Sequence, residues 1–186
     1  MSLTLIAPPA GEPISLDDLK AHLRVAHTDE DPLIAALGVA ARQSVEVRAG
    51  LALTTQQWRL SLDAAPARPV YLPMRPLISV EAVTVVGPND SVIHPPAGTF
   101  DIVTGLSGRI VRTGVWPRPA KAAGGVRIDF TAGWSSVDAV PAGILQAIRL
   151  LTAHFYENRE AASVERTFAI PQTVDALLAP FREARL

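Results

Sequence analysis

The chain has 186 residues, of which 48% are hydrophobic and 19% charged, enough for one domain with a core, or for one domain carrying a modest insertion. Its 17 basic and 18 acidic residues leave a formal charge of -1, which excludes a global attraction for nucleic acid or anionic lipid, so any DNA contact is local or transient. The absence of cysteine excludes disulfides, thiol catalysis and thiolate metal sites, and is compatible with synthesis in a reducing cytoplasm. The first residues lack the pattern of a signal peptide, and no apolar stretch is long enough to cross a bilayer.

A short amphipathic helix is predicted near the start of the chain. Ser15 is placed to cap it, with Asp18 three residues further on. Ile14 and Leu19 have the spacing of a hydrophobic staple, which fixes the direction in which the chain enters a helix. The sequence therefore predicts a helix that begins directly after Ser15.

A second helix is predicted to begin at Asp31 and Pro32, a capping carboxylate followed by a proline whose missing N–H costs nothing at the first helical position. Gly50 can supply the left-handed residue that ends this helix. Its apolar face is predicted from four residues at helical spacing: Leu33, Leu37, Ala41 and Val45.

From Thr54 onward the hydrophobic period changes to two, which is typical of strands. Trp58, Leu60 and Leu62 alternate with polar residues, and breaks such as Gly-Pro, Pro-Pro and Gly-Gly separate the later strand candidates. We expect an antiparallel sheet with further strands at residues 78–86, 91–94, 100–103, 109–112 and 126–131.

Helical spacing returns after Pro141, and a last short helix is predicted near Thr173. Pro180 should end or kink that helix because proline cannot donate to the helical ladder. This order of elements predicts an α+β fold, a mainly helical body of about four helices with an inserted antiparallel β region. The predicted parts are residues 1–53 for the N-terminal helical part of the body, 54–139 for the β-rich insertion, and 140–186 for the C-terminal helices and tail.

The sequence contains no nucleophile elbow, zinc-protease motif, phosphate-binding loop or dinucleotide fingerprint. Its four histidines lack metal-ligand spacing. The acidic run of residues 29–31 could be a cation site or an acid/base pair, but acidic groups before a helix are explained more simply by the helix dipole. We therefore predict no catalytic, metal or cofactor-binding residues and no cofactor.

Three tryptophans and a set of basic residues are candidates for contact surfaces. Trp58, Trp116 and Trp134 are more typical of core or interface anchors than of ligand-stacking aromatics. The β region and its loops have a local basic bias that could face DNA or an acidic partner, although scattered solvated charges account as well for any one residue. The residues concerned are Arg109, Arg112, Arg118, Lys121 and Arg127.

Seven stretches, in order along nearly the whole chain, resemble the phage head-tail connector family, the adaptor proteins related to those of the HK97 and phiE125 phages and of gene transfer agents. Each stretch alone is weakly specific, whereas seven in family order are hard to produce by chance. They are PPAGEPISLDDLKAHLRV (8–25), DEDPLIAAL (29–37), VEVRAGLALTTQQW (45–58), LPMRPLISVEAVTV (72–85), IDFTAGW (128–134), VPAGILQAIRLLTAHFYENRE (140–160) and IPQTVDALLAPFR (170–182).

The resemblance implies a closed ring of copies, a dodecamer, beneath the portal protein of a virion or phage-like particle, with transient, non-specific DNA in its channel and a tail or stopper protein below. Such a particle neck is assembled in the bacterial cytoplasm. Subunit contacts would involve Trp58, Trp116 and Trp134, and the channel would be faced by Arg109, Arg112 and Lys121. No contact with a membrane is expected.

The tail after Pro180 is our candidate for the portal contact, because a short segment with one aromatic and two basic residues suits docking into a partner's groove. Its candidate residues are Phe181, Arg182 and Arg185. The alternative is that Phe181 packs back on the helical body.

Two other classes of function stay open from the residues alone. A small carbohydrate- or nucleic-acid-binding module would use Trp116, Trp134 and the local arginines as its platform, and would act as a monomer. An enzyme could use His154 and Glu157, about one helical turn apart, as an acid/base pair. The connector hypothesis instead predicts ring formation on a portal.

Overall fold

The structure, a computed structural model, describes residues 1–158 and 171–182. The chain forms two compact units, which we call the β unit and the helical unit. The β unit contains Met1–Ala10 and Thr54–Ser135, and the helical unit contains Gly11–Leu53 and Ser136–Leu186. The first ten residues, which were expected in the helical part, thus belong to the β unit. The β unit is therefore formed by two separate segments of the chain.

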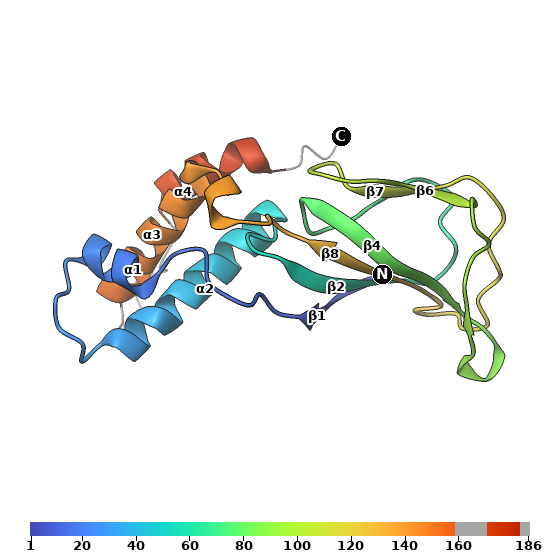
Figure 1. Ribbon diagram of the computed structural model, residues 1–186, viewed down its shortest axis with the longest axis horizontal. Helices are drawn as coiled ribbons and strands as arrows, with labels where there is room; N and C mark the ends of the chain where they lie inside the picture. The colour runs from blue at the N-terminus through green and yellow to red at the C-terminus, as the bar shows by residue number, and fades with distance from the viewer. Residues whose placement is uncertain (159–170, 183–186) are drawn as a thin grey trace, which may run out of the picture. The chain divides into compact units, whose positions relative to one another are not determined.

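The helical unit is built from four α-helices over the described residues (Figure 1). They are α1 (Leu16–Leu23), α2 (Asp31–Ala49), α3 (Ala142–Glu157) and α4 (Gln172–Leu178), with short 3-10 turns at Val137–Ala139 and Ala179–Phe181. The predicted caps are confirmed: the Ser15 hydroxyl accepts the Asp18 N–H at 3.1 Å, and Gly50 ends α2 at a φ of 64°. Helix α4 ends before Pro180, as predicted.

The core of the helical unit is formed where α2, α3 and α4 meet. Helix α2 turns Ile34 and Gly38 inward along with the predicted Ala41 and Val45, whereas Leu33 is 37% exposed. The predicted apolar face of α2 is therefore wrong at its first residue, because the buried face begins one position later. Apolar side chains from the other helices complete the core: Leu19, Ile144, Ile148, Leu151, Val174 and Leu178.

The β unit contains a five-stranded antiparallel sheet in the order β1-β2-β8-β4-β5 (Figure 1). Its strands are β1 (Ser2–Ala7), β2 (Gln56–Leu62), β8 (Val126–Ala132), β4 (Leu77–Val86) and β5 (Val92–Ile93). Because Leu60 lies opposite Ile128, and Ile128 opposite Val83, these three buried residues share one face of the sheet. Arg59 lies opposite Asp129, and this pair is on the other, polar face.

A smaller sheet in the β unit has the order β3-β7-β6. Its strands are β3 (Val70–Tyr71), β7 (Arg109–Arg112) and β6 (Phe100–Val103), and a 3-10 turn at Pro88–Asp90 precedes β5 in the larger sheet. Ile110 in the central strand is fully buried. The strands predicted from period-two alternation are confirmed, whereas β1 and β3 were not predicted.

The α+β class is confirmed, although the body is less dominated by helix than expected, since the described residues include eight strands beside the four α-helices. Among the described residues, no helix is long and apolar enough to span a bilayer.

Candidate assembly surfaces

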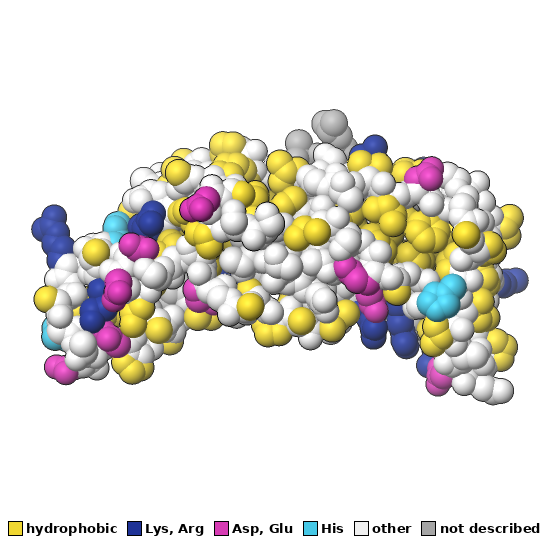
Figure 2. Space-filling model, viewed as in Figure 1, with side chains coloured by type: hydrophobic (Ala, Val, Ile, Leu, Met, Phe, Trp, Pro, Cys, Tyr) yellow, Lys and Arg dark blue, Asp and Glu magenta, His cyan; other side chains and the backbone are white. Residues whose placement is uncertain are grey.

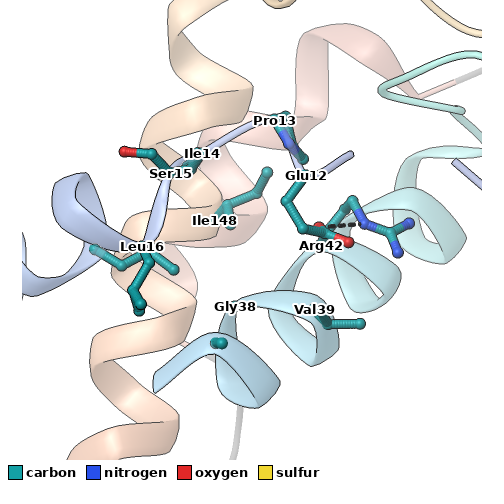
Figure 3. A pocket seen from close by; sticks show the side chains of 11 residues that line it. Glu12, Pro13, Ile14, Ser15, Leu16, Gly38, Val39, Arg42 and Ile148 are labelled. Carbon is teal, nitrogen blue, oxygen red and sulfur yellow. Dashed lines mark hydrogen bonds and ion pairs between the residues drawn. The ribbon is translucent and has the colours of Figure 1, made fainter. Parts of the chain in front are cut away.

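An apolar pocket of about 260 Å³ lies within the helical unit (Figure 3). It is bordered by the segment that leads into α1 and by one side each of α1, α2 and α3. Gly38 lets α1 approach α2 closely, since a Cβ there would lie 2.6 Å from Cδ1 of Leu19. The apolar lining includes Ile14, Leu16, Leu19, Val39 and Ile148.

One end of this pocket is formed by a buried network of charged residues centred on Arg42. Arg42 is 5% exposed, and its Nε and Nη1 donate to Glu12 Oε2 at 2.6 Å and to Glu46 Oε2 at 2.5 Å (Figure 3 shows the first contact). Glu46, 4% exposed, also accepts the backbone N–H of Leu53 through Oε1 at 2.9 Å. The network ties the residues before α1, the middle of α2 and the segment after α2 to one another, so its role is to hold the unit together.

The outward face of α2 between Leu33 and Val47 is uncharged, although the helix contains an arginine and a glutamate in this stretch. These two, Arg42 and Glu46, point inward, while Leu33 is 37% and Val47 82% exposed. The solvent face of a helix in a monomeric protein usually carries the charged residues. The other exposed residues between Leu33 and Val47 are Ala35, Ala36, Ala40 and Gln43.

An apolar groove of about 400 Å³ runs beside this face. It is lined by Leu33, Leu37 and Ala40 of α2 and by Phe155 and Asn158 at the end of α3. This groove was not predicted, because helical spacing places Leu33 and Leu37 on one apolar face with Ala41 and Val45. A side chain from another molecule could be buried here at little cost, since the lining is mostly apolar.

The acidic run before α2 is occupied by contacts within the helical unit. Asp31 Oδ1 accepts from Lys20 Nζ at 2.6 Å, and the Glu30 carboxylate accepts the hydroxyl of Tyr156 and lies 3.8 Å from the His27 ring. Within the described residues, no cluster of three or more His, Cys, Asp or Glu residues could hold a metal ion. The cation-site alternative gains no support from this geometry.

Within the described residues, His154 and Glu157, considered above as an acid/base pair, form neither a hydrogen bond nor an ion pair with each other. The His154 ring instead lies 3.3 Å from the Asn158 side-chain amide, which also donates to the His154 carbonyl at 2.7 Å. These contacts close the last turn of α3.

The three tryptophans lie in the β unit and differ in burial. Trp116 is 5% exposed, donates through Nε1 to the Thr99 carbonyl at 3.1 Å and meets Phe100 edge-on at 5.6 Å. Trp58 and Trp134 are half-buried. Trp116 therefore packs inside its own unit, and a subunit contact through any of the three stays a prediction.

The basic candidates are dispersed over the β unit. Arg109 lies on β7 with its guanidinium carbon 5.8 Å from the centre of the Tyr71 ring, while Arg112 is exposed at the end of the same strand. Lys121 lies in a loop and pairs with Asp90, and this contact lowers the pKa of the Asp90 carboxyl. The three do not form one cluster of contacts, and their position facing a channel stays a prediction.

The polar face of the larger sheet was not predicted as a surface. Arg59 makes two hydrogen bonds to Asp129, from Nε at 2.6 Å and from Nη2 at 2.7 Å, and these bonds raise the pKa of the guanidinium. On the same face, Glu81 Oε1 accepts from the hydroxyls of Ser79 and Thr131, each at 2.6 Å. The pairing of β2 with β8 brings Arg59 and Asp129 together, and the sequence alone does not specify that pairing.

At the other end of the chain, the candidates for a portal contact follow α4. Phe181 is half-buried, and Arg182 is exposed and donates through Nη2 to Asp175 at 2.5 Å. Asp175 also lies 3.5 Å from Arg48 at the end of α2, so the segment up to Arg182 is held by contacts within the helical unit. Arg185 lies outside the described residues.

An uncharged, exposed helix face beside an apolar groove is a candidate surface for contact with another macromolecule. The chain belongs to the head completion protein family, whose model matches residues 12–184. No curated protein matches the chain.

Three solved structures that are similar to the chain come from gene transfer agent particles. A chain in the neck of an empty particle, computed with C6 symmetry, is 27% identical with a TM-score of 0.82, and one in the neck of a native particle, computed with C12 symmetry, is 28% identical with a TM-score of 0.76. A chain in the virion of the native particle is 27% identical with a TM-score of 0.81. Each match covers 100% of this chain and 97% of the other.

Proposed function

We propose that the chain is a head-to-tail connector subunit in the neck of a tailed phage or gene transfer agent particle. The observation that carries this proposal is the similarity over its whole length to chains of gene transfer agent necks. The family model for head completion proteins, which spans most of the same residues, supports it independently. The role is structural, and we assign no catalytic step to it.

The subunits form a closed ring of twelve beneath the portal protein, with a tail or stopper protein below. The C12 symmetry used for the neck of the native particle supports this number. DNA passes through the channel without being held, which a chain of formal charge -1 suits because every phosphate bound by a cation would slow passage.

The experiment is to mix the purified chain with the portal protein of the same particle and to examine the mixture by native mass spectrometry and electron microscopy. We expect a ring of the chain attached to one end of the portal, and weak self-association of the chain alone. A chain that stays monomeric beside a well-formed portal would contradict the proposal.

Within this proposal the segment after α4 makes the portal contact through Phe181, Arg182 and Arg185. Deleting residues 180–186 should abolish portal binding and leave the circular dichroism spectrum unchanged, because the helical core lies before Pro180. Arg48→Ala, which also removes an arginine near Asp175, is the control and should bind the portal normally. Undiminished binding by the deleted chain would assign the portal contact elsewhere.

A further inference from the structure

In the part of the chain that the structure describes, the outward face of α2 is exposed and an apolar groove lies beside it. The helix buries its own charged pair, Arg42 with Glu46, and presents Leu33, Ala40 and Val47 to solvent. Figure 2 shows other hydrophobic side chains reaching the surface between clusters of charged ones. Exposed apolar area of this kind, next to a groove, is typical of a protein–protein contact.

The smaller sheet of the β unit carries a second exposed surface, which we call the hairpin patch and which consists of Tyr71, Leu106 and Arg109. Tyr71 and Leu106 are each 53% exposed, and Leu106 lies in the turn that joins β6 to β7. Arg109 lies opposite Tyr71 in the pairing of β3 with β7, so these two side chains share one face of the sheet. The hairpin patch therefore combines two exposed apolar side chains with one basic residue.

The two units also carry opposite net charges. The β unit contains eight Lys and Arg against five Asp and Glu residues, a net charge of +3, and the helical unit contains nine against thirteen, a net charge of -4. The acidic run of residues 29–31 ends two positions before Leu33, the first residue of the groove along the chain. Complementary charge of this kind favours contact between the β unit of one copy and the helical unit of another.

A closed ring needs two different, complementary surfaces on each subunit, because each copy contacts its two neighbours through different faces. Resting on the proposed function, we propose that the α2 face with its groove binds the hairpin patch of the next copy in the ring. Leu106, in the turn between β6 and β7, enters the apolar groove. Arg109 then lies at the subunit contact, which replaces its predicted position facing the channel.

Disulfide cross-linking tests this contact cleanly because the chain has no cysteine. One copy carries Ala40→Cys in the groove and another carries Leu106→Cys in the hairpin patch, and the two are mixed with the portal and mildly oxidised. We expect a covalent dimer that contains both variants and forms only in assembled rings. Val92→Cys, on exposed β5, replaces Leu106→Cys in the control and should give no dimer.

The outcomes separate this inference from the proposed function. Rings without the Ala40→Cys to Leu106→Cys dimer overturn the inference and leave the connector role standing. Dimers that join two Ala40→Cys copies indicate a symmetric contact and overturn it as well. A complete failure of the unsubstituted chain to form rings overturns the connector role and, with it, the inference.

A charge placed on the α2 face gives a second measurement. Ala40→Glu should lower the fraction of chains in rings about tenfold, because a carboxylate would be buried in an apolar contact. Ala21→Glu, at an exposed position on α1, is the matched control and should assemble normally. If Ala40→Glu forms rings as well as the control, or forms rings but no longer holds the tail, the face serves another contact and the inference is wrong.

Discussion

In the helical unit, Arg42 and Glu46 are buried and paired while the outward face of α2 is uncharged, whereas in the β unit Arg59 and Asp129 pair on a half-exposed sheet face. The internal network leaves the outside of α2 available for apolar contact. The β unit keeps its charges at the surface, where water and salt weaken them. Buried charges thus connect segments inside the helical unit, whereas the partly exposed charges of the β unit contribute less to stability.

The largest expected effect breaks the buried network of the helical unit. Arg42→Met leaves the buried Glu46 and the partly exposed Glu12 without their shared cation, which should lower the free energy of unfolding by about 3–5 kcal/mol. Urea unfolding followed by circular dichroism measures this value. Arg48→Met, which removes a more exposed arginine at the end of α2, should cost less than about 1 kcal/mol. Equal losses in the two variants would contradict a structural role for the network.

The next effect concerns the β unit, where a glycine and not a charge fixes the backbone. Gly133 has a φ of 127°, and a Cβ there would lie 2.3 Å from the Thr54 carbonyl oxygen, which cannot move away easily. Gly133→Ala should therefore lower the free energy of unfolding by about 1–3 kcal/mol. Gly98→Ala, at a φ of 76° with open space around it, should cost about 1 kcal/mol or less. Urea unfolding of both variants decides whether the clash with Thr54 adds to the cost of positive φ.

A smaller effect sharpens the comparison between buried and surface pairs. Arg59→Met should lower the free energy of unfolding by about 0.2–1 kcal/mol, because the pair with Asp129 is partly exposed. The loss should be smaller in about 1 M salt, because the Debye length is then about 3 Å and salt screens the attraction between the two exposed charges. The loss from Arg42→Met should change much less with salt. A salt-independent loss at Arg59 would mean that its aliphatic stem, and not its charge, stabilises the sheet.

Local signals in the sequence predicted the helix starts and ends and most of the strands, because Ser15, Pro32 and Gly50 act through their immediate neighbours. The residues that form the core face of α2 were harder to predict. Leu33 and Ile34 are adjacent and both apolar, and only packing against other helices decides that Ile34 is buried. Helix propensity describes how well each residue fits a helix and does not predict which of the two is buried.

The candidate surfaces depended still more on tertiary structure. Arg42 and Glu46 would be read as a solvated i, i+4 pair, and their burial requires Glu12, 30 residues earlier, to supply the second carboxylate. Strand β1 was missed because its pairing with β2 joins residues fifty or more positions apart. Family resemblance predicted the place in a particle, whereas the residues proposed for each contact depend on which side chains the folded units leave exposed.

The smallest expected effect is on a surface carboxyl of the β unit. The hydrogen bond and charge of Lys121 lower the pKa of Asp90, and the N–H of Gly124 and the terminal ammonium lower that of Asp63. Since each folded-state pKa is lowered, the stabilisation is present above the unfolded value near 3.9 and is lost as the pH falls through the folded value. Lys121→Met should return the pKa of Asp90 toward its ordinary value and leave that of Asp63 unchanged, as carboxyl titration by NMR will measure. A parallel shift of both carboxyls would mean that the substitution disturbs the loop that holds Gly124 and would remove the evidence for a specific Lys121–Asp90 pair.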